Sequence, residues 1–289
     1  MKLVTNDYGC GTSSSILDYG IEDVIIVSES NWEHIFDAND DLLFIGHDFL
    51  MYMWDTDEKV QRLKQYPHAK LVWCFERIDA IVPSWQQKSH YSISKISQFA
   101  DEIIGCDEDD CSKYNLRWLP QWASNKFYNL RSQTPNNRSD ILFSGQAGKP
   151  EYKFRNELLA ACQSSDILKD RLKITNIDRS LTWEQYVQNL LSYNTIINPV
   201  GVLKALNTRA YEGLYSGRIV LQHQVGNYER HQELLKNDKN IVFFNDYKDL
   251  LEKIDLINDL ESVTDKEIKK AYERNNLFAR MKSIGVDIK

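Results

Sequence analysis

The sequence predicts an α/β protein with two doubly wound parallel sheets, and three observations support this class. Short apolar runs of strand length alternate with stretches of helical periodicity along most of the chain. A polar, turn-rich segment at 125–140 interrupts this alternation near the middle, and the same alternation resumes after it. With 289 residues, 42% of them hydrophobic, the chain is long enough to bury two cores.

The first half of the chain contains a series of predicted strands separated by helical stretches. Apolar runs of strand length lie at 2–5, 23–27, 42–45, 70–75 and 102–104, with a sixth candidate at 117–119. Amphipathic helices are expected around 58–65 and 92–100, where apolar residues recur at helical spacing. Strands joined through helices run in the same direction, so this half should form one parallel sheet.

The second half repeats the pattern. Its predicted strands are 141–144, 172–175, 194–197, 218–222 and 240–244, and its predicted helices are 152–162, 183–191, 207–215, 229–235 and 247–257. A charged helical stretch at 265–281 ends the series. We therefore predict an N-terminal domain at 1–130, a C-terminal domain at 131–264 and, at 265–289, a C-terminal helix that packs back on the N-terminal domain.

Composition excludes several classes of function. The formal charge of −7 disfavours broad attraction to nucleic-acid phosphates or to an anionic membrane. No apolar run approaches the roughly 20 residues that span a bilayer, and the first residues are too polar for a signal peptide. The five cysteines lack paired spacing, so neither a disulfide framework nor a zinc site is predicted. A cytoplasmic protein is expected.

Open parallel sheets bind ligands at the carboxyl ends of their strands. Two sheets of this kind are therefore expected to face a cleft that holds the functional site.

The most informative segment is NPVGVLKALNTRAYEGLYSGRIVLQ at 198–222. Its polar side chains gather where the predicted helix begins, at Lys204, Asn207, Thr208, Arg209 and Glu212. A helix start offers free N–H groups and a partial positive charge, and two cationic side chains there suit a diphosphate. The glutamate lies on the same helical side as the arginine, where it can accept hydrogen bonds from two ribose hydroxyls.

A simpler interpretation is that Asn207 caps the helix and Arg209 pairs with Glu212 on the surface. However, a capping box starting at Asn207 or Thr208 would place its glutamate at position 210 or 211. The simpler interpretation therefore leaves Glu212 unexplained, whereas Gly217 fits a helix end in either case.

The string LNTRAYEGLYSGRIVL resembles the C-terminal signature of family-1-type glycosyltransferases of GT-B fold, in particular the spore-maturation-protein-like group. Three more stretches agree with this resemblance: ILFSGQAGKPEYKFRNELL, VFFNDYKDLLEKI and RWLPQWAS. Together they cover roughly residues 70–257. The resemblance implies two Rossmann-like domains and metal-independent transfer of a sugar from a UDP- or GDP-linked donor to a glycan, lipid or protein acceptor.

The resemblance also implies roles for individual residues. Glu212 would hold the ribose of the donor, and the residues just before it would lie near the pyrophosphate. The implied donor-binding residues are Gly145, Lys149, Arg155, Lys204, Asn207, Thr208, Arg209 and Glu212. Retaining enzymes of the group carry two glutamates eight residues apart, whereas the position eight before Glu212 is Lys204. A lysine there can neutralise the leaving phosphate, and no cofactor is expected.

Candidates for a catalytic base or an acceptor contact follow strands of the first domain. They are His47 and Asp48 in FIGHDF and Glu76 in CFERID, and Asp79 lies nearby. Each can equally be a helix cap or a solvated loop residue. The aromatic residues Trp73, Trp85, Tyr91 and Trp122 can line an acceptor cleft or pack in the core.

Other motifs are less specific. Asp55-Thr-Asp57 and Asp107-Glu-Asp109 have the D-x-D spacing of a metal site, but such patterns also begin charged helices, so no metal is predicted. GCGTSSS at 9–15 can bind phosphate or simply cap a helix, and it lacks the G-x-G-x-x-G spacing.

Two other functions fit the same fold. One is a non-catalytic module that binds a nucleotide sugar or a glycan, and the other is a GT-B-shaped sugar-nucleotide epimerase that needs no acceptor. A DNA-modifying glucosyltransferase also shares the fold, but the acidic charge argues against a nucleic-acid partner.

Overall fold

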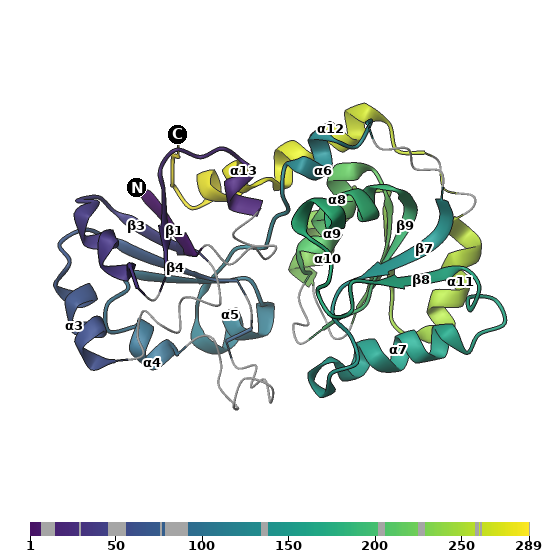
Figure 1. Ribbon diagram of the computed structural model, residues 1–289, viewed down its shortest axis with the longest axis horizontal. Coiled ribbons are helices and arrows are strands. Elements are labelled where there is room, and N and C mark those ends of the chain that lie inside the picture. The colour runs from purple at the N-terminus through teal and green to yellow at the C-terminus, as the bar shows by residue number, and fades with distance from the viewer. Residues whose placement is uncertain are drawn as a thin grey trace. The chain divides into compact units, whose positions relative to one another are not determined.

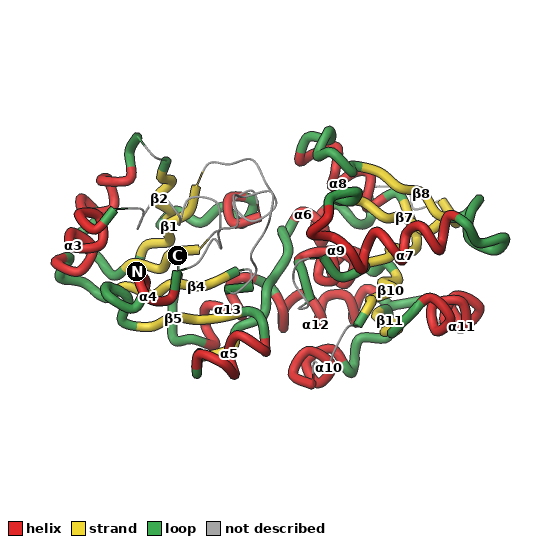
Figure 2. Tube along the Cα trace, turned by 90° about the horizontal axis from the view of Figure 1, so that it is seen from below, coloured by secondary structure: helices red, strands yellow, loops and turns green. Residues whose placement is uncertain are grey.

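The computed structural model describes residues 1–6, 15–28, 30–45, 56–75, 77–78, 92–133, 138–201, 206–224, 229–257, 260 and 262–288. The chain divides into two compact units, residues 1–121 with 277–289 and residues 122–276. Each unit contains one parallel sheet with helices beside it, and strands alternate with helices along both (Figures 1 and 2). The predicted α/β class with two doubly wound sheets is confirmed.

The first unit is built on a six-stranded sheet of order β2-β1-β3-β4-β5-β6, with parallel pairing throughout. Its strands are β1 (Lys2–Asn6), β2 (Val24–Val27), β3 (Leu42–Ile45), β4 (Lys70–Cys74), β5 (Glu102–Gly105) and β6 (Arg117–Trp118). Its helices are η1 (Trp32–Asp37), α3 (Asp57–Gln65), α4 (Ile93–Ile96), α5 (Glu108–Tyr114) and α13 (Leu277–Ser283). One face of the sheet packs on η1, α3 and α4 in a single apolar cluster.

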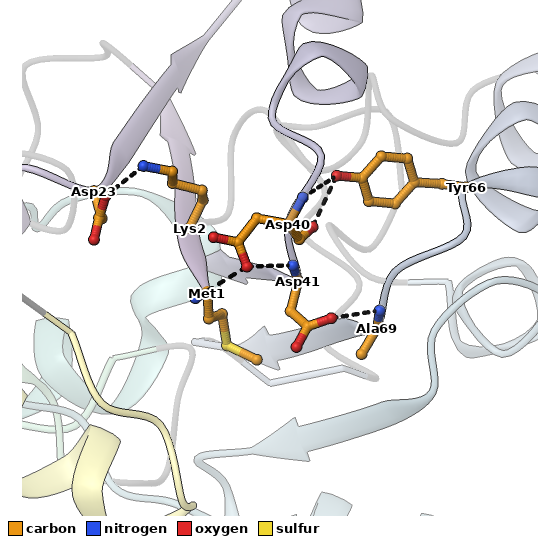
Figure 3. A network of polar contacts seen from close by, with 7 residues as sticks. All are labelled: Met1, Lys2, Asp23, Asp40, Asp41, Tyr66 and Ala69. Carbon is orange, nitrogen blue, oxygen red and sulfur yellow. Dashed lines mark hydrogen bonds and ion pairs between the residues drawn. The ribbon is translucent and has the colours of Figure 1, made fainter.

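Polar contacts join the amino ends of neighbouring strands in this sheet (Figure 3). The terminal amino group of Met1 lies 3.2 Å from the Asp40 carboxylate, which also accepts a hydrogen bond from the Asp41 amide. Asp41 in turn accepts from the Ala69 amide at 2.9 Å, and the Tyr66 hydroxyl donates to the Asp40 carbonyl at 2.8 Å. These contacts tie the turns before β3 and β4 together, at the end of the sheet opposite its carboxyl edge.

The second unit is built on a five-stranded parallel sheet of order β11-β10-β9-β7-β8. Its strands are β7 (Arg138–Ser144), β8 (Leu172–Thr175), β9 (Tyr193–Asn198), β10 (Ile219–His223) and β11 (Ile241–Phe244). Its helices are α6 (Lys126–Asn129), η3 (Pro150–Tyr152), α7 (Lys153–Gln163), α8 (Trp183–Leu191), α9 (Thr208–Ser216), α10 (Glu229–Leu235), α11 (Tyr247–Ile257) and α12 (Asp265–Asn275).

Alternate residues of these strands enter two separate cores, one on each face of the sheet. Leu142, Ile196 and Val220 pack with α8, α9 and α10, whereas Phe143 and Leu221 pack with α7 and α11. Buried faces on both sides explain why these strands appear in the sequence as continuous apolar runs.

The strand order reverses direction between β7 and β9. The chain goes first from β7 to β8 on one side, and then to β9, β10 and β11 on the other. A reversal of this kind leaves a crevice at the carboxyl ends of the two central strands, where doubly wound sheets bind ligands.

Two local predictions differ from the structure. The polar segment 125–140 is not a bare linker, because α6 lies within it and packs on α9 with Phe127 fully buried. The helix predicted at 265–281 is interrupted at Asn276, whose backbone is extended. The Tyr215 hydroxyl donates to the Asn275 carbonyl at 2.6 Å and takes an acceptor that a continuing helix would use.

The interruption separates two helices that pack in different units. α12 packs on α9 and α6 of the second unit. α13 belongs to the first unit, where Phe278 meets the edge of the Tyr19 ring at 5.4 Å and Arg280 donates to the Gln121 carbonyl at 3.3 Å. The chain therefore returns to the first unit only from Leu277, whereas α12, which was predicted to pack there as well, packs in the second unit. Within the described residues, no helix is long and apolar enough to cross a membrane.

The close packing of α9 on β10 gives a first prediction. A Cβ atom at Gly213 would lie 2.1 Å from Cγ2 of Val220. Gly213→Ala should therefore lower the free energy of unfolding by ~1–3 kcal/mol, as overpacking does in other cores. Urea denaturation of the purified protein measures this change.

Val220→Ala in the Gly213→Ala background removes the clashing methyl group and should recover part of the loss. Fully additive losses in the double variant would show that this contact does not set the helix–strand distance.

Candidate functional site

The candidate site lies at the carboxyl ends of β7 and β9, where the strand order reverses. Because these strands are parallel neighbours, the loops after Ser144 and after Asn198 leave the same edge of the sheet. α9 begins at this edge with Asn207 as its cap, since the Asn207 carboxamide accepts a hydrogen bond from the Arg209 amide at 3.0 Å. Two loops and a helix start therefore converge at this edge.

The Arg209 side chain lies close to Gly145, the first residue after β7. A Cβ atom at Gly145 would be 2.3 Å from Nη2 of Arg209, and Gly145 has a φ of +148°. The positive φ favours glycine at this position, and any side chain there would displace the Arg209 guanidinium. The resemblance implied donor-binding roles for both residues, and the structure brings them into contact.

An amide network fixes the direction of the Arg209 side chain. Its Nη1 donates to Oδ1 of Asn198 at 2.9 Å. The Asn198 side chain is fully buried, and its Nδ2 donates to Gln222 at 2.7 Å and to the capping oxygen of Asn207 at 3.0 Å. The last residues of β9 and β10 thus hold the guanidinium at the start of α9.

Arg155 comes from α7 and reaches the same edge. Its guanidinium donates to the Gln146 carbonyl at 2.5 Å and to the Pro199 carbonyl at 3.4 Å. A Cβ atom at Gly201 would lie 2.5 Å from Nη2 of Arg155, so a second glycine accommodates a second guanidinium. Burial, and next the charge of Arg209, lower the pKa of Arg155 to about 9.

The two guanidiniums share one aromatic ring. The Cζ atoms of Arg155 and Arg209 lie 5.6 and 5.4 Å from the centre of the Phe143 ring. Among the described residues neither forms an ion pair, and their buried Nε atoms have no hydrogen-bond partner. Two neighbouring cations that form no direct ion pair, and have only the nearby Glu212 carboxylate as a counter-charge, are costly, and a bound anion relieves that cost. A guanidinium can donate two parallel hydrogen bonds to the oxygens of a phosphate.

Glu212 provides a buried carboxylate one helical turn after Arg209. Its side chain is only 3% exposed, and it accepts a hydrogen bond from the Tyr186 hydroxyl at 2.5 Å. Burial raises the pKa of Glu212, while Arg209 and the hydroxyls of Tyr186 and Thr208 act in the opposite direction. The surface pairing of Arg209 with Glu212 is therefore wrong, because the carboxylate is buried and the guanidinium bonds to Asn198 instead.

Tyr186 is a side chain of the candidate site that sequence reasoning missed. It lies on α8, whose start is fixed by a capping box between Thr182 and Gln185. Its ring stacks on Trp183 at 5.7 Å, and both rings meet the edge of Phe127. Neither motif nor spacing relates α8 to α9, so only the folded chain reveals the contact.

The remaining donor-binding candidates differ in how the structure places them. Lys149 is exposed in the loop after β7, which Asn156 holds by accepting from the Gly148 amide and donating to the Lys149 carbonyl, both at 2.8 Å. Thr208 begins α9 beside Arg209. Lys204 lies outside the described residues.

Several first-unit candidates also lie outside the described residues: His47, Asp48, Asp55, Glu76, Asp79, Trp85, Tyr91 and residues 9–14. Trp73 and Trp122 are fully buried and pack in cores, so they do not line an open cleft. Asp107 caps α5 by accepting from the amides of Asp109 and Asp110. Within the described part of the chain, no group of three acidic, histidine or cysteine side chains is placed to hold a metal ion.

No protein-family profile matches the sequence, and no curated protein matches it. Solved structures do match. HepE of Anabaena in complex with UDP-glucose superposes with a TM-score of 0.60 at 10% identity, covering 99% of this chain and 98% of HepE. The chain has the GT-B glycosyltransferase fold.

Two further structures support this assignment of the fold. Sucrose-phosphate synthase from Thermosynechococcus elongatus gives a TM-score of 0.56 at 13% identity, covering 89% of this chain and 74% of the enzyme. An alpha-glucosyltransferase in complex with UDP and DNA gives 0.52 at 12% identity, covering 91% and 84%. Identities this low establish the fold alone, so the spore-maturation-protein-like subgroup stays a prediction.

The burial of Glu212 predicts a pH dependence of stability. Its folded pKa is raised above the ordinary value of 4.5, so the folded state binds the proton more tightly than the unfolded state. The stability that this proton contributes is complete below pH 4.5 and is lost as pH rises through the folded pKa. Glu212→Gln should therefore be more stable than wild type at neutral pH.

The difference between Glu212→Gln and wild type should shrink as pH falls toward 4.5, where both side chains are neutral. Thermal unfolding at a series of pH values measures it. A variant less stable than wild type at every pH would contradict the assigned cause.

Proposed function

We propose that the second unit binds a nucleoside-diphosphate sugar and that the chain transfers its sugar to an acceptor hydroxyl. The observation that carries this proposal is the pair of neighbouring guanidiniums, Arg155 and Arg209, which form no direct ion pair and lie beside the buried carboxylate of Glu212. These groups lie at the same edge of the second sheet. The two cations suit a diphosphate, and the carboxylate suits a vicinal diol.

The diphosphate is proposed to bind at the start of α9. The guanidinium of Arg209 lies there, where it donates to Asn198 and approaches Gly145 closely. Arg155 adds a second positive charge. The partial positive charge of the helix start acts in the same direction.

The ribose is proposed to bind Glu212, since a carboxylate accepts hydrogen bonds from both hydroxyls of a vicinal diol. One turn of helix separates the guanidinium from the carboxylate, so phosphate and ribose would lie on one face of α9.

Transfer requires stabilisation of the departing nucleoside diphosphate and a partner for the acceptor proton. We assign the first task to Arg209 and Arg155, with Lys204 as a further cation, and no metal ion. For the second task His47, Asp48 and Glu76 remain the candidates. The UDP and UDP-glucose bound in the structural neighbours favour a uridine donor over a guanosine donor. A glycan, lipid or protein is the proposed acceptor.

Calorimetry with UDP-glucose, UDP, GDP-mannose and GDP tests the donor site. Arg209→Met should weaken binding about tenfold to a hundredfold, because a hydrogen bond to a charged group contributes ~1.5–3 kcal/mol. EDTA should change nothing. Arg171→Met is the matched control, since Arg171 precedes β8 at the opposite end of the same sheet.

Absence of binding by wild type to every nucleotide would overturn the proposal. Binding without hydrolysis or transfer in the presence of candidate acceptors would instead indicate a binding module. Conversion of the donor to its epimer without any acceptor would indicate an epimerase.

A further inference from the structure

Opposite charges lie close together in the site, yet they do not pair. Arg209 and Glu212 are three positions apart on α9, a spacing at which such side chains commonly form an ion pair. In this protein Arg209 donates to Asn198 and also hydrogen-bonds the Tyr186 hydroxyl, and that hydroxyl donates to Glu212. A neutral phenol from another helix therefore contacts both charged groups and stands in place of a direct ion pair.

The Tyr186 hydroxyl is in a fixed position. Its ring is stacked on Trp183 at 5.7 Å and meets the edge of Phe127 at 6.3 Å, so two helices besides α9 hold it. Burial and the neighbouring carboxylate raise the pKa of Tyr186, so the phenol stays protonated and donates. A hydrogen bond of 2.5 Å to a carboxylate is in the range of strong charge-assisted bonds.

Removal of the Tyr186 hydroxyl would change which groups contact Glu212. Glu212 would keep the bond from Thr208, and its best remaining partner would be the guanidinium of Arg209. An ion pair between them would occupy the groups that the proposed function assigns to ribose and to diphosphate. The Asn198 amide is a weaker acceptor than a carboxylate, so it would not hold Arg209 alone.

We propose that Tyr186 is a positioning residue that holds Glu212 away from Arg209 and so keeps both charged groups available to the nucleotide sugar. The proposal rests on the proposed function and adds a requirement to it. The phosphate site is usable only while a phenol on a different helix binds the carboxylate. Tyr186 therefore acts on diphosphate binding without contacting the diphosphate.

Calorimetry with two probes, UDP-glucose and inorganic pyrophosphate, tests this role. Tyr186→Phe should weaken both probes at least about tenfold, because the released carboxylate captures Arg209. Glu212→Gln should weaken UDP-glucose but leave pyrophosphate binding intact, since an uncharged amide does not capture a guanidinium.

The double variant separates positioning from structural damage. Tyr186→Phe combined with Glu212→Gln should bind pyrophosphate as well as Glu212→Gln alone. Tyr215→Phe is the matched control, because it removes another buried phenol hydrogen bond at α9, to the Asn275 carbonyl at 2.6 Å. It should leave the affinity for both probes unchanged.

Three results would decide against the inference. Unchanged pyrophosphate affinity in Tyr186→Phe, or a double variant no better than Tyr186→Phe, would show that Tyr186 does not keep the charges apart while leaving the donor site in place. Failure of wild type to bind either probe would overturn the proposed function together with this role.

Discussion

The close approach of the Arg209 guanidinium to Gly145 is the constraint on which the rest of the site depends. Any side chain at Gly145 would displace the guanidinium, and that guanidinium links the end of β7 to the start of α9. Its hydrogen bond to Asn198 extends the link to β9 and, through Gln222, to β10. A single cation thereby contacts three strand ends and one helix, directly or through amide side chains.

The site is organised by separation of charge rather than by pairing. Neutral groups hold its ionic side chains: an asparagine holds Arg209, backbone carbonyls hold Arg155, and a tyrosine holds Glu212. Paired charges would be more stable in isolation, but they would have no capacity left for a ligand. The raised pKa of Glu212 and the lowered pKa of Arg155 are consequences of this arrangement, since burial is the largest effect on both groups and outweighs their polar contacts.

Sequence patterns predicted the sheets closely because strands buried on both faces are continuous apolar runs. The predicted strands at 42–45 and 172–175 coincide with β3 and β8. Patterns failed where a tertiary contact overrides local preference. α6 forms in a polar segment where Phe127 packs into the second core, and the helix after Asp265 ends where the Tyr215 hydroxyl donates to the Asn275 carbonyl.

The sequence by itself determined the groups that lie within one element. Asn207, Arg209 and Glu212 lie on consecutive turns of one helix, so helical geometry alone brings them together. Only the tertiary structure decided what surrounds them. Arg155, Gly201 and Tyr186 come from elements far apart in sequence, and they meet because β7 pairs with β9 and the strand order reverses there. Strand order depends on how entire faces of the sheet pack against the helices, and the local periodicity of the sequence does not predict this packing.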